Sequence, residues 1–256
     1  MAGLWNAGRL PGLGAGHISA FMSEKPDKTS KEEPKGERIA KVMARAGLCS
    51  RREAERWIVE GRVRVDGKIL TSPALTVTPD NTVVVDGKPL PGKAQTRLWR
   101  YHKPPGLVTS HSDPQGRATV FERIPKSLGR VISVGRLELN TEGLLLLTND
   151  GEFSQLMTHP SFGVRKTYMV RVDGLVDFDS VEKLRKGAFI DGTKVVPLSV
   201  RVGRRTKAFS AVEITIREGR NREVRRLLAR SGLKVRQLKR VRIGSLGVKG
   251  VKRGGY

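Results

Sequence analysis

A guanidinium and a carboxylate stand just ahead of an apolar run near the middle of the chain. Arg136 and Glu138 precede four consecutive leucines, residues 144–147, within ISVGRLELNTEGLLLLTNDGEF. The run is too short to cross a membrane, and the turn residues after it indicate a buried strand that ends in a loop. Two opposite charges at the mouth of a buried strand could form a structural ion pair. They could also supply a reactive acid and the cation that keeps it ionised and oriented.

Two later segments carry further polar side chains in apolar surroundings. Tyr168 alternates with apolar residues in RKTYMVRV, so its ring is expected to face a core or a cleft. In REGRNREVRRLLARSG, Asn221 is expected to cap a helix. The buried positions of that helix would be Val224, Leu227 and Leu228, and its basic face would hold Arg222, Arg225 and Arg226. A core tyrosine and a solvated basic helix are the structural alternatives to a functional site.

The chain as a whole is strongly basic. Its 256 residues include 49 Lys and Arg against 25 Asp and Glu, which gives a formal net charge of +24 and a pI near 10.9. Such an excess favours a polyanionic partner, and nucleic acid is the first candidate. No long apolar segment points to a membrane partner.

Cys49 is the only cysteine, which fits a reducing compartment, and we expect the protein in the cytoplasm. The four histidines are scattered, so no metal site is expected.

The elements that would position these residues begin after an N-terminal tail. Residues 1–36 are expected to be disordered, because residues 23–37 mix both charges with Pro and Ser. Residues 1–22 contain no acidic residue. An extended start ahead of Met22 and a targeting segment both remain open for them.

Residues 37–87 predict a small domain of two helices and two hairpins. Apolar residues at helical spacing lie along 39–46, and Ser50 with Glu53 forms a capping box for a second helix. Asp-Gly pairs at 66–67 and 86–87 each indicate a two-residue hairpin. Cations gather near the capped helix start, where backbone amides also favour phosphate. These candidate phosphate-binding residues are Lys41, Arg45, Arg51, Arg52, Arg56, Arg62 and Arg64.

A linker at residues 88–96 leads to a larger domain at residues 97–247, which a basic tail at 248–256 follows. Strand-like runs recur in the larger domain at 131–135, 143–148, 167–173 and 211–217. Helical segments fit 153–158, 178–187 and 221–231. Strands interspersed with helices, without regular βαβ spacing, predict an α+β domain on a mixed, mostly antiparallel sheet flanked by helices.

The motifs of both domains resemble one enzyme family. RIAKVMARAGLCSRREAERWIVEGRVRVDGK is similar to the RNA-binding domain named after small-subunit ribosomal protein S-four. RYHKPPGLVTSHSDPQGRATVFERIP, VGRLELNTEGLLLLTNDGEF, RKTYMVRV and EGRNREVRRLLARSGLKVRQLKRVRIG look like the successive motifs of ribosomal pseudouridine synthases. The resemblance spans about residues 37–247 and is strongest to the B-type enzymes that modify RNA of the large ribosomal subunit.

The resemblance implies an enzyme that isomerises a uridine within ribosomal RNA, expected to be large-subunit RNA, without a cofactor. The reaction breaks the base–sugar bond, turns the uracil and rejoins it through carbon. The target base must leave its stack to be reached. A carboxylate would act at the sugar, either by attacking the anomeric carbon or by removing the neighbouring proton, and both routes stay open.

The resemblance also assigns roles to residues of this chain. Glu138 would be the catalytic carboxylate, Arg225 the cation that holds it, and Tyr168 the ring that stacks on uracil. The expected substrate-binding residues are Arg136, Leu238 and Lys103. The seven cations of the first domain would bind ribosomal RNA or a pre-ribosomal particle, and a monomer is expected.

One departure from the family pattern concerns the acid itself. The family has aspartate after Gly-Arg-Leu, whereas this chain has Glu138. The extra methylene moves the carboxylate by roughly 1.5 Å, and a misplacement of about 1 Å can cost on the order of a hundredfold in rate. A non-catalytic RNA-binding or ribosome-assembly factor with a degenerate site is therefore the alternative function.

Overall fold

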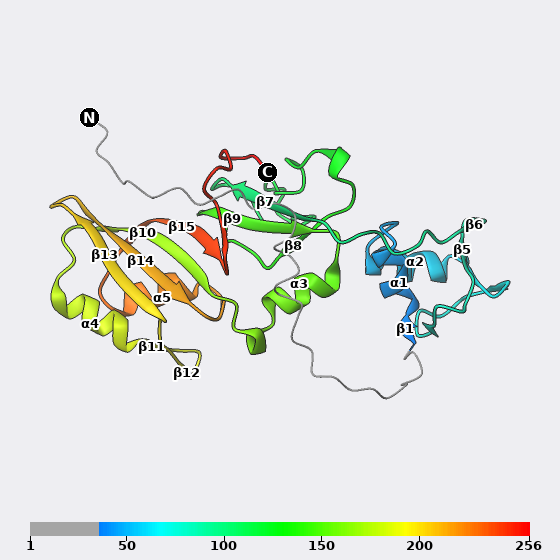
Figure 1. Cartoon of the computed structure of the whole chain (residues 1–256), viewed down its shortest axis with the longest axis horizontal. Coiled ribbons are helices and arrows are strands. Elements are labelled where there is room, and N and C mark those ends of the chain that lie inside the picture. The colour runs from blue at the N-terminus through cyan, green and yellow to red at the C-terminus, as the bar shows by residue number, and fades with distance from the viewer. Residues whose placement is uncertain (1–35) are drawn as a thin grey trace. The chain divides into compact units, whose positions relative to one another are not determined.

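The computed structural model describes residues 36–256 (Figure 1), so the tail expected at residues 1–36 falls outside the described residues apart from Gly36. The first domain contains two short helices, α1 (Ile39–Arg45) and α2 (Arg51–Val59). Its main sheet has the order β3-β2-β5-β6, with bounds Lys68–Ile69, Val63–Val65, Val83–Val85 and Lys88–Pro89. A small second sheet pairs β1 (Glu37–Arg38) with β4 (Thr76–Val77).

Local sequence signals place the elements of the first domain. The capping box is present, because the Ser50 hydroxyl accepts from the Glu53 amide and the Glu53 carboxylate accepts from the Ser50 amide. Both expected hairpins form, with Asp66 and Asp86 in left-handed backbone conformations. Ile39, Met43 and other apolar side chains from both helices close the core over the strands.

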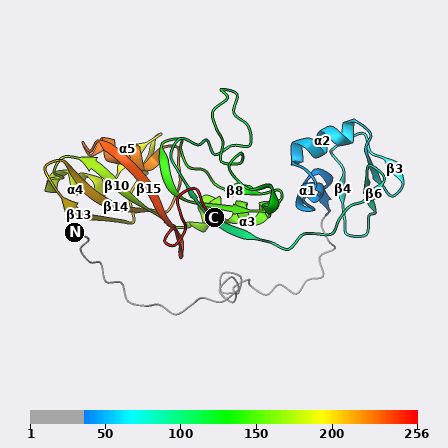
Figure 2. The same cartoon turned by 90° about the horizontal axis from the view of Figure 1, so that it is seen from above.

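The larger domain is built on one sheet with the strand order β13-β14-β10-β15-β9-β7. In addition, β8 pairs with β9 and β16 pairs with β15. The strand bounds are β7 Leu98–Lys103, β8 Ile132–Val134, β9 Thr141–Thr148, β10 Lys166–Asp173, β13 Ser199–Arg205, β14 Phe209–Ile216, β15 Val235–Ile243 and β16 Leu246–Gly247. Every pairing is antiparallel except that of β15 with β9, which is parallel. The predicted mixed, mostly antiparallel sheet is therefore confirmed. Figure 2 shows β10 and β15 running side by side in this sheet.

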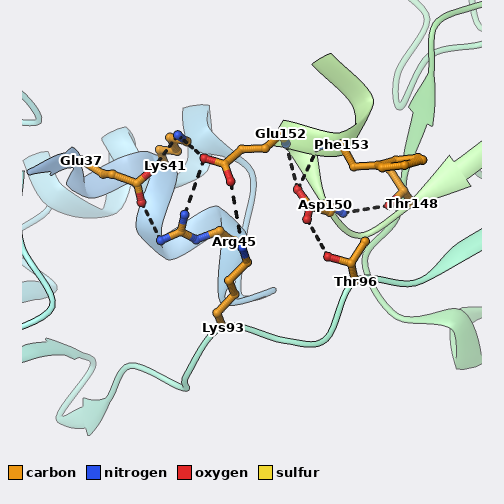
Figure 3. A network of polar contacts seen from close by, with 9 residues as sticks. All are labelled: Glu37, Lys41, Arg45, Lys93, Thr96, Thr148, Asp150, Glu152 and Phe153. Carbon is orange, nitrogen blue, oxygen red and sulfur yellow. Dashed lines mark hydrogen bonds and ion pairs between the residues drawn. The ribbon is translucent and has the colours of Figure 1, made fainter. Parts of the chain in front are cut away.

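Three helices flank this sheet: α3 (Gly151–Thr158), α4 (Phe178–Lys186) and α5 (Glu223–Arg230). A two-stranded hairpin, β11 (Ala188–Ile190) with β12 (Thr193–Val195), follows α4. Two single helical turns lie at Lys126–Leu128 and Pro160–Phe162. Asp150, which follows the leucine strand, caps α3, and its other oxygen accepts from Thr96, 2.6 Å away (Figure 3).

The start of α5 differs from the expectation. Arg222, not Asn221, occupies the N-cap position, and it does so in a left-handed conformation with no side-chain cap. Glu223 instead turns its carboxylate back to the amide of Arg220 at 2.7 Å. The predicted Asn221 cap was wrong because the helix begins one residue later than expected, and no side chain accepts from its first amides.

The four-leucine run forms the middle of β9, and all eight residues of the strand are buried. Leu145 and Leu147 join the large core that includes side chains of α4 and α5, whereas Leu144 and Leu146 pack in a second cluster with residues of β8 and α3. Because both faces of the strand are covered, its middle, residues 144–147, is continuously apolar and does not alternate.

The strand β9 begins earlier than its apolar run suggested. Glu142 lies inside β9, not ahead of it, and its carboxylate meets the His102 ring and the Lys239 ammonium, both at 3.0 Å. Burial opposes ionisation of Glu142, but hydrogen bonds from Lys239 and His102 outweigh it and lower the pKa of this carboxyl. The segment expected as a basic tail is bound to β7. The amide of His102 in that strand donates to the carbonyl of Gly255, and the carbonyl of His102 accepts from the amide of Gly254.

Candidate active site

Glu138 lies on the segment between β8 and β9, where the chain enters the buried leucine strand. Its Oε2 atom accepts hydrogen bonds from Arg225 Nε and Arg222 Nη1, each at 3.0 Å. The Arg225 side chain is only 16% exposed, while that of Arg222 is 56% exposed. No hydrogen bond to Glu138 Oε1 occurs among the described residues. One oxygen is thus held by two guanidinium groups, and the other is left for a further partner.

Helix α5 delivers both arginines because its apolar side faces the core. Val224, Leu227 and Leu228 are buried, which turns Arg225 toward the β9 entrance. Arg225 also donates from Nη2 to the carbonyl of Asn140 at 3.1 Å, so it holds the segment as well as the acid. Arg226, expected on the same basic face, instead forms two hydrogen bonds of 2.8 Å with Asp191.

Tyr168 and Leu238 lie on neighbouring central strands. Tyr168 on β10 is buried and pairs in register with Arg240 of β15 and Ile214 of β14. Leu238 on β15 is also buried and pairs with Thr141, the first residue of β9. Both side chains belong to the large core cluster. Strand β15 therefore lies directly beside the start of β9, the strand that Glu138 precedes, and β10 lies on the other side of β15.

Lys103 does not lie where a substrate-binding residue was expected. Its side chain is completely buried, and Nζ donates to the carbonyls of Pro104, Glu138, Leu139 and Thr141 at 3.0–3.2 Å. Burial, aided by the nearby Arg240 charge, lowers the pKa of Lys103 to about 8. The protons of this ammonium are thus all directed to carbonyl groups of the protein.

Arg136, which was expected to bind substrate, is exposed two residues before the acid. Its carbonyl accepts from Nη1 of Arg240 at 3.4 Å, and Nε of Arg240 donates to the carbonyl of Leu144 at 2.8 Å. Sequence reasoning missed Arg240 as a site residue. The only feature of the sequence that pointed to it was a basic residue two positions after Leu238, on the same side of an alternating strand as that buried leucine.

The seven cations of the first domain divide into two groups. Lys41 and Arg45 pair with Glu37 and Glu152 (Figure 3). Arg56 pairs with Glu60, and Arg62 pairs with Asp86 and Glu60. Arg51, Arg52 and Arg64 are exposed and form no ion pair within residues 36–256. The last three, two of them at the capped start of α2, are the cations most available for a phosphate.

Two further features of residues 36–256 bear on the class of protein. None of the helices in this range is long and apolar enough to cross a membrane. The range also holds no group of three or more His, Cys, Asp and Glu side chains placed to bind a metal ion.

A small domain rich in exposed cations, joined to a sheet domain with an arginine-held acid, defines a nucleic-acid-modifying protein. Family models match both parts: residues 37–88 match the S4 domain, and residues 97–230 match the RNA pseudouridylate synthase family. The chain belongs to the RNA pseudouridylate synthase family, whose members are isomerases.

Individual relatives agree with the family models. The chain is 43% identical over 220 residues to an uncharacterized RNA pseudouridine synthase of Rickettsia felis, covering 86% of this chain and 95% of that protein. It is 42% identical to the ribosomal large subunit pseudouridine synthase B of Haemophilus influenzae, covering 92% of this chain and 70% of that protein. A solved pseudouridylate synthase crystal structure superposes with a TM-score of 0.58 at 27% identity, over 85% of this chain and 94% of that one.

Proposed function

We propose that this protein converts a specific uridine of large-subunit ribosomal RNA to pseudouridine, with Glu138 as the catalytic carboxylate. The observation that carries the proposal is the Glu138 carboxylate held by Arg225 and Arg222 at the entrance of β9. Relatives that are named for the large ribosomal subunit support the substrate class.

The geometry suits a carboxylate that acts through one oxygen. Two guanidinium groups on Oε2 fix the direction of the carboxylate. Oε1 can then approach the sugar of a uridine that has left its stack. There it either attacks the anomeric carbon or takes the neighbouring proton, after which the freed uracil turns and bonds through carbon. No cofactor is needed for either route in this proposal.

Side chains around the acid would hold the flipped nucleotide. Tyr168 would stack on the uracil and Leu238 would pack beneath it, since Leu238 lies on β15 beside the start of β9 and Tyr168 lies on β10, the next strand. Arg136, exposed two residues before Glu138, would hold the space that the base leaves. Arg51, Arg52 and Arg64 would bind RNA phosphates. We propose that the protein acts as a monomer in the cytoplasm, where Cys49 stays reduced.

The test is Glu138→Gln, which keeps the size of the side chain and removes its charge. We expect pseudouridine formation in ribosomal RNA to be lost while RNA affinity stays within about twofold, because the neutral amide can neither attack nor take a proton. Pseudouridine mapping in ribosomal RNA from cells that carry only the variant measures the first quantity and filter binding the second. A Glu138→Gln protein as active as wild type would show that another group is the catalytic acid.

The longer acid is the observation that favours the second function, a non-catalytic RNA-binding factor. Glu138→Asp separates the two functions. If the site has adapted to glutamate, the shorter acid loses its contact with Arg225 and activity falls, on the order of a hundredfold for a shift of about 1 Å. An inactive wild type beside an active Glu138→Asp variant would establish the binding function and refute the enzymatic one.

A further inference from the structure

The segment that carries Glu138 has an unusual hydrogen-bonding pattern. Each of its six backbone carbonyls, from residue 136 to residue 141, accepts from a side chain of another segment of the chain. Arg240 donates to carbonyl 136 at 3.4 Å, Thr109 to 137 at 2.9 Å, and Arg225 to 140 at 3.1 Å. Lys103 donates to carbonyls 138, 139 and 141 at 3.0–3.2 Å. Three cations and one hydroxyl thus surround one short irregular segment.

Two of these cations are buried without a matching carboxylate. Lys103 is fully buried and Arg240 is only 3% exposed, and neither forms an ion pair within residues 36–256. Arg240 Nη2 is buried without any hydrogen-bond partner among the described residues. Burying a charge in this way costs stability, and apolar replacements of buried charges are often neutral or stabilising. Overall stability therefore does not explain why both cations are present.

The main chain adds only a few restraints to the segment: the amide of Thr141 donates to carbonyl 138 at 3.1 Å, and the amide of Gly106 donates to carbonyl 139 at 2.8 Å. Leu137 is its only buried apolar side chain, Leu139 is half-buried, and Asn140 is exposed. It forms no helix or strand before Thr141. With so little packing and so few main-chain hydrogen bonds, the direction of the Glu138 side chain depends on the side chains that bind the carbonyls of the segment.

We propose that Lys103 and Arg240 are positioning residues, which act by holding the backbone on both sides of Glu138 so that its carboxylate meets Arg225. Lys103 fixes carbonyls 138, 139 and 141, and Arg240 fixes carbonyl 136 to carbonyl 144 of the leucine strand. Neither residue touches the substrate. The inference rests on the proposed role of Glu138.

The positioning role makes activity sensitive to the charge of Lys103. The charged groups that face Lys103 are Arg240 on β15, Glu138 in the segment and Glu142 on β9, and the net effect of burial and these charges is a pKa of about 8. As pH rises through this value the ammonium loses a proton, and with it a donor to the carbonyls. Catalysis at saturating enzyme should fall in the same pH range.

The experiment compares Lys103→Met and Arg240→Gln with Arg242→Gln, a control that removes an exposed cation from the same strand as Arg240. Amide hydrogen exchange of peptides covering residues 136–144 reports the order of the segment without reference to activity. Single-turnover pseudouridine formation at saturating enzyme, between pH 6.5 and 9.5, reports catalysis, with these pH limits set roughly to bracket the Lys103 pKa.

We expect exchange in this segment to accelerate about tenfold or more in Lys103→Met and Arg240→Gln, and the single-turnover rate to fall roughly ten- to a hundredfold. RNA affinity should stay within about twofold, and Arg242→Gln should match wild type in exchange and in rate. The wild-type rate should decline as pH rises past about 8, and this decline should be absent in Lys103→Met.

Three outcomes would overturn the inference. Unchanged exchange in both variants would show that the cations do not order the segment. Faster exchange with an unchanged rate would show that this order does not matter to catalysis. A decline above pH 8 that persists in Lys103→Met would show that another group causes it.

If wild type itself formed no pseudouridine, the proposed function would fail, and the exchange measurement alone would decide whether the cations order the segment. If one variant does not fold, the pH profile of wild type and the exchange of the other variant still test the positioning role.

Discussion

At the scale of single residues, the site depends on how two arginines share one oxygen of Glu138. Both lie at 3.0 Å from Oε2, yet Arg225 is largely buried and Arg222 is mostly exposed. Arg225 also donates to the Asn140 carbonyl, so it fixes the acid and its backbone together. An exposed ion pair gains little because water screens it. The two arginines should therefore contribute unequally.

We predict that Arg225→Ala lowers the single-turnover rate by roughly a hundredfold to a thousandfold, as removal of a preorganised charge partner does in other active sites. Arg222→Ala should lower it by less than about tenfold, because solvent already weakens that pair. Arg226→Ala is the matched control on the same helix, since Arg226 pairs with Asp191. Equal defects in Arg222→Ala and Arg225→Ala would refute the ranking by burial.

At the scale of elements, one close backbone approach sets the parallel pairing of β9 and β15. Gly143 pairs with Arg240 and has φ of +115°. A β-carbon at this position would lie 2.1 Å from the Arg240 carbonyl oxygen. Only glycine allows both the dihedral angle and the approach. This contact brings the β9 entrance, and so Glu138, beside the strand that carries Leu238.

Gly143→Ala should destabilise the larger domain by roughly 3 kcal/mol or more, because the added carbon forces the two strands apart in a dihedral region that alanine avoids. For a domain of this size that corresponds to a fall in melting temperature of about 6–12 °C. Calorimetry measures the shift. Gly203→Ala is the control, since its β-carbon would meet nothing closer than 3.8 Å in the edge strand β13. A Gly143→Ala protein that melts like wild type would contradict the steric argument.

At the scale of the whole molecule, a net charge of +24 attracts RNA regardless of sequence. The basic residues that carry this charge have different surroundings in the structure. Lys103 and Arg240 are buried in the larger domain, while Lys41, Arg45 and Arg62 are paired with carboxylates. Exposed cations such as Arg51 and Arg52, which form no ion pair within residues 36–256, remain for phosphate contacts.

Replacing both Arg51 and Arg52 with Ala should weaken RNA binding and reduce the slope of log affinity against log salt by about 1.4–1.8, since each phosphate contact contributes about 0.7–0.9. The single-turnover rate at saturating enzyme should stay within about twofold, because the chemistry lies in the other domain. Binding titrations at several salt concentrations measure the slope. A chemical step slowed as strongly as in Glu138→Gln would show that the first domain contributes to catalysis itself.

The sequence alone determined the features that depend on near neighbours along the chain. The capping box at Ser50 needs only a glutamate three residues later, and each Asp-Gly hairpin needs only its two turn residues. The leucine run identified a buried strand because burial on both faces requires continuous apolar residues. The order of the motifs also indicated the family and the meeting of Glu138 with Arg225.

The tertiary structure decided which polar groups meet across long stretches of chain. Arg222 reaches Glu138 over 84 positions, and Arg240 reaches the Arg136 carbonyl over 104. Lys103, expected at the substrate, is enclosed by carbonyls of a segment about 35 residues away. A side chain's burial and its hydrogen-bond partners are properties of the packed neighbours around it. No local pattern of residue types could therefore show that these cations hold the backbone around the acid.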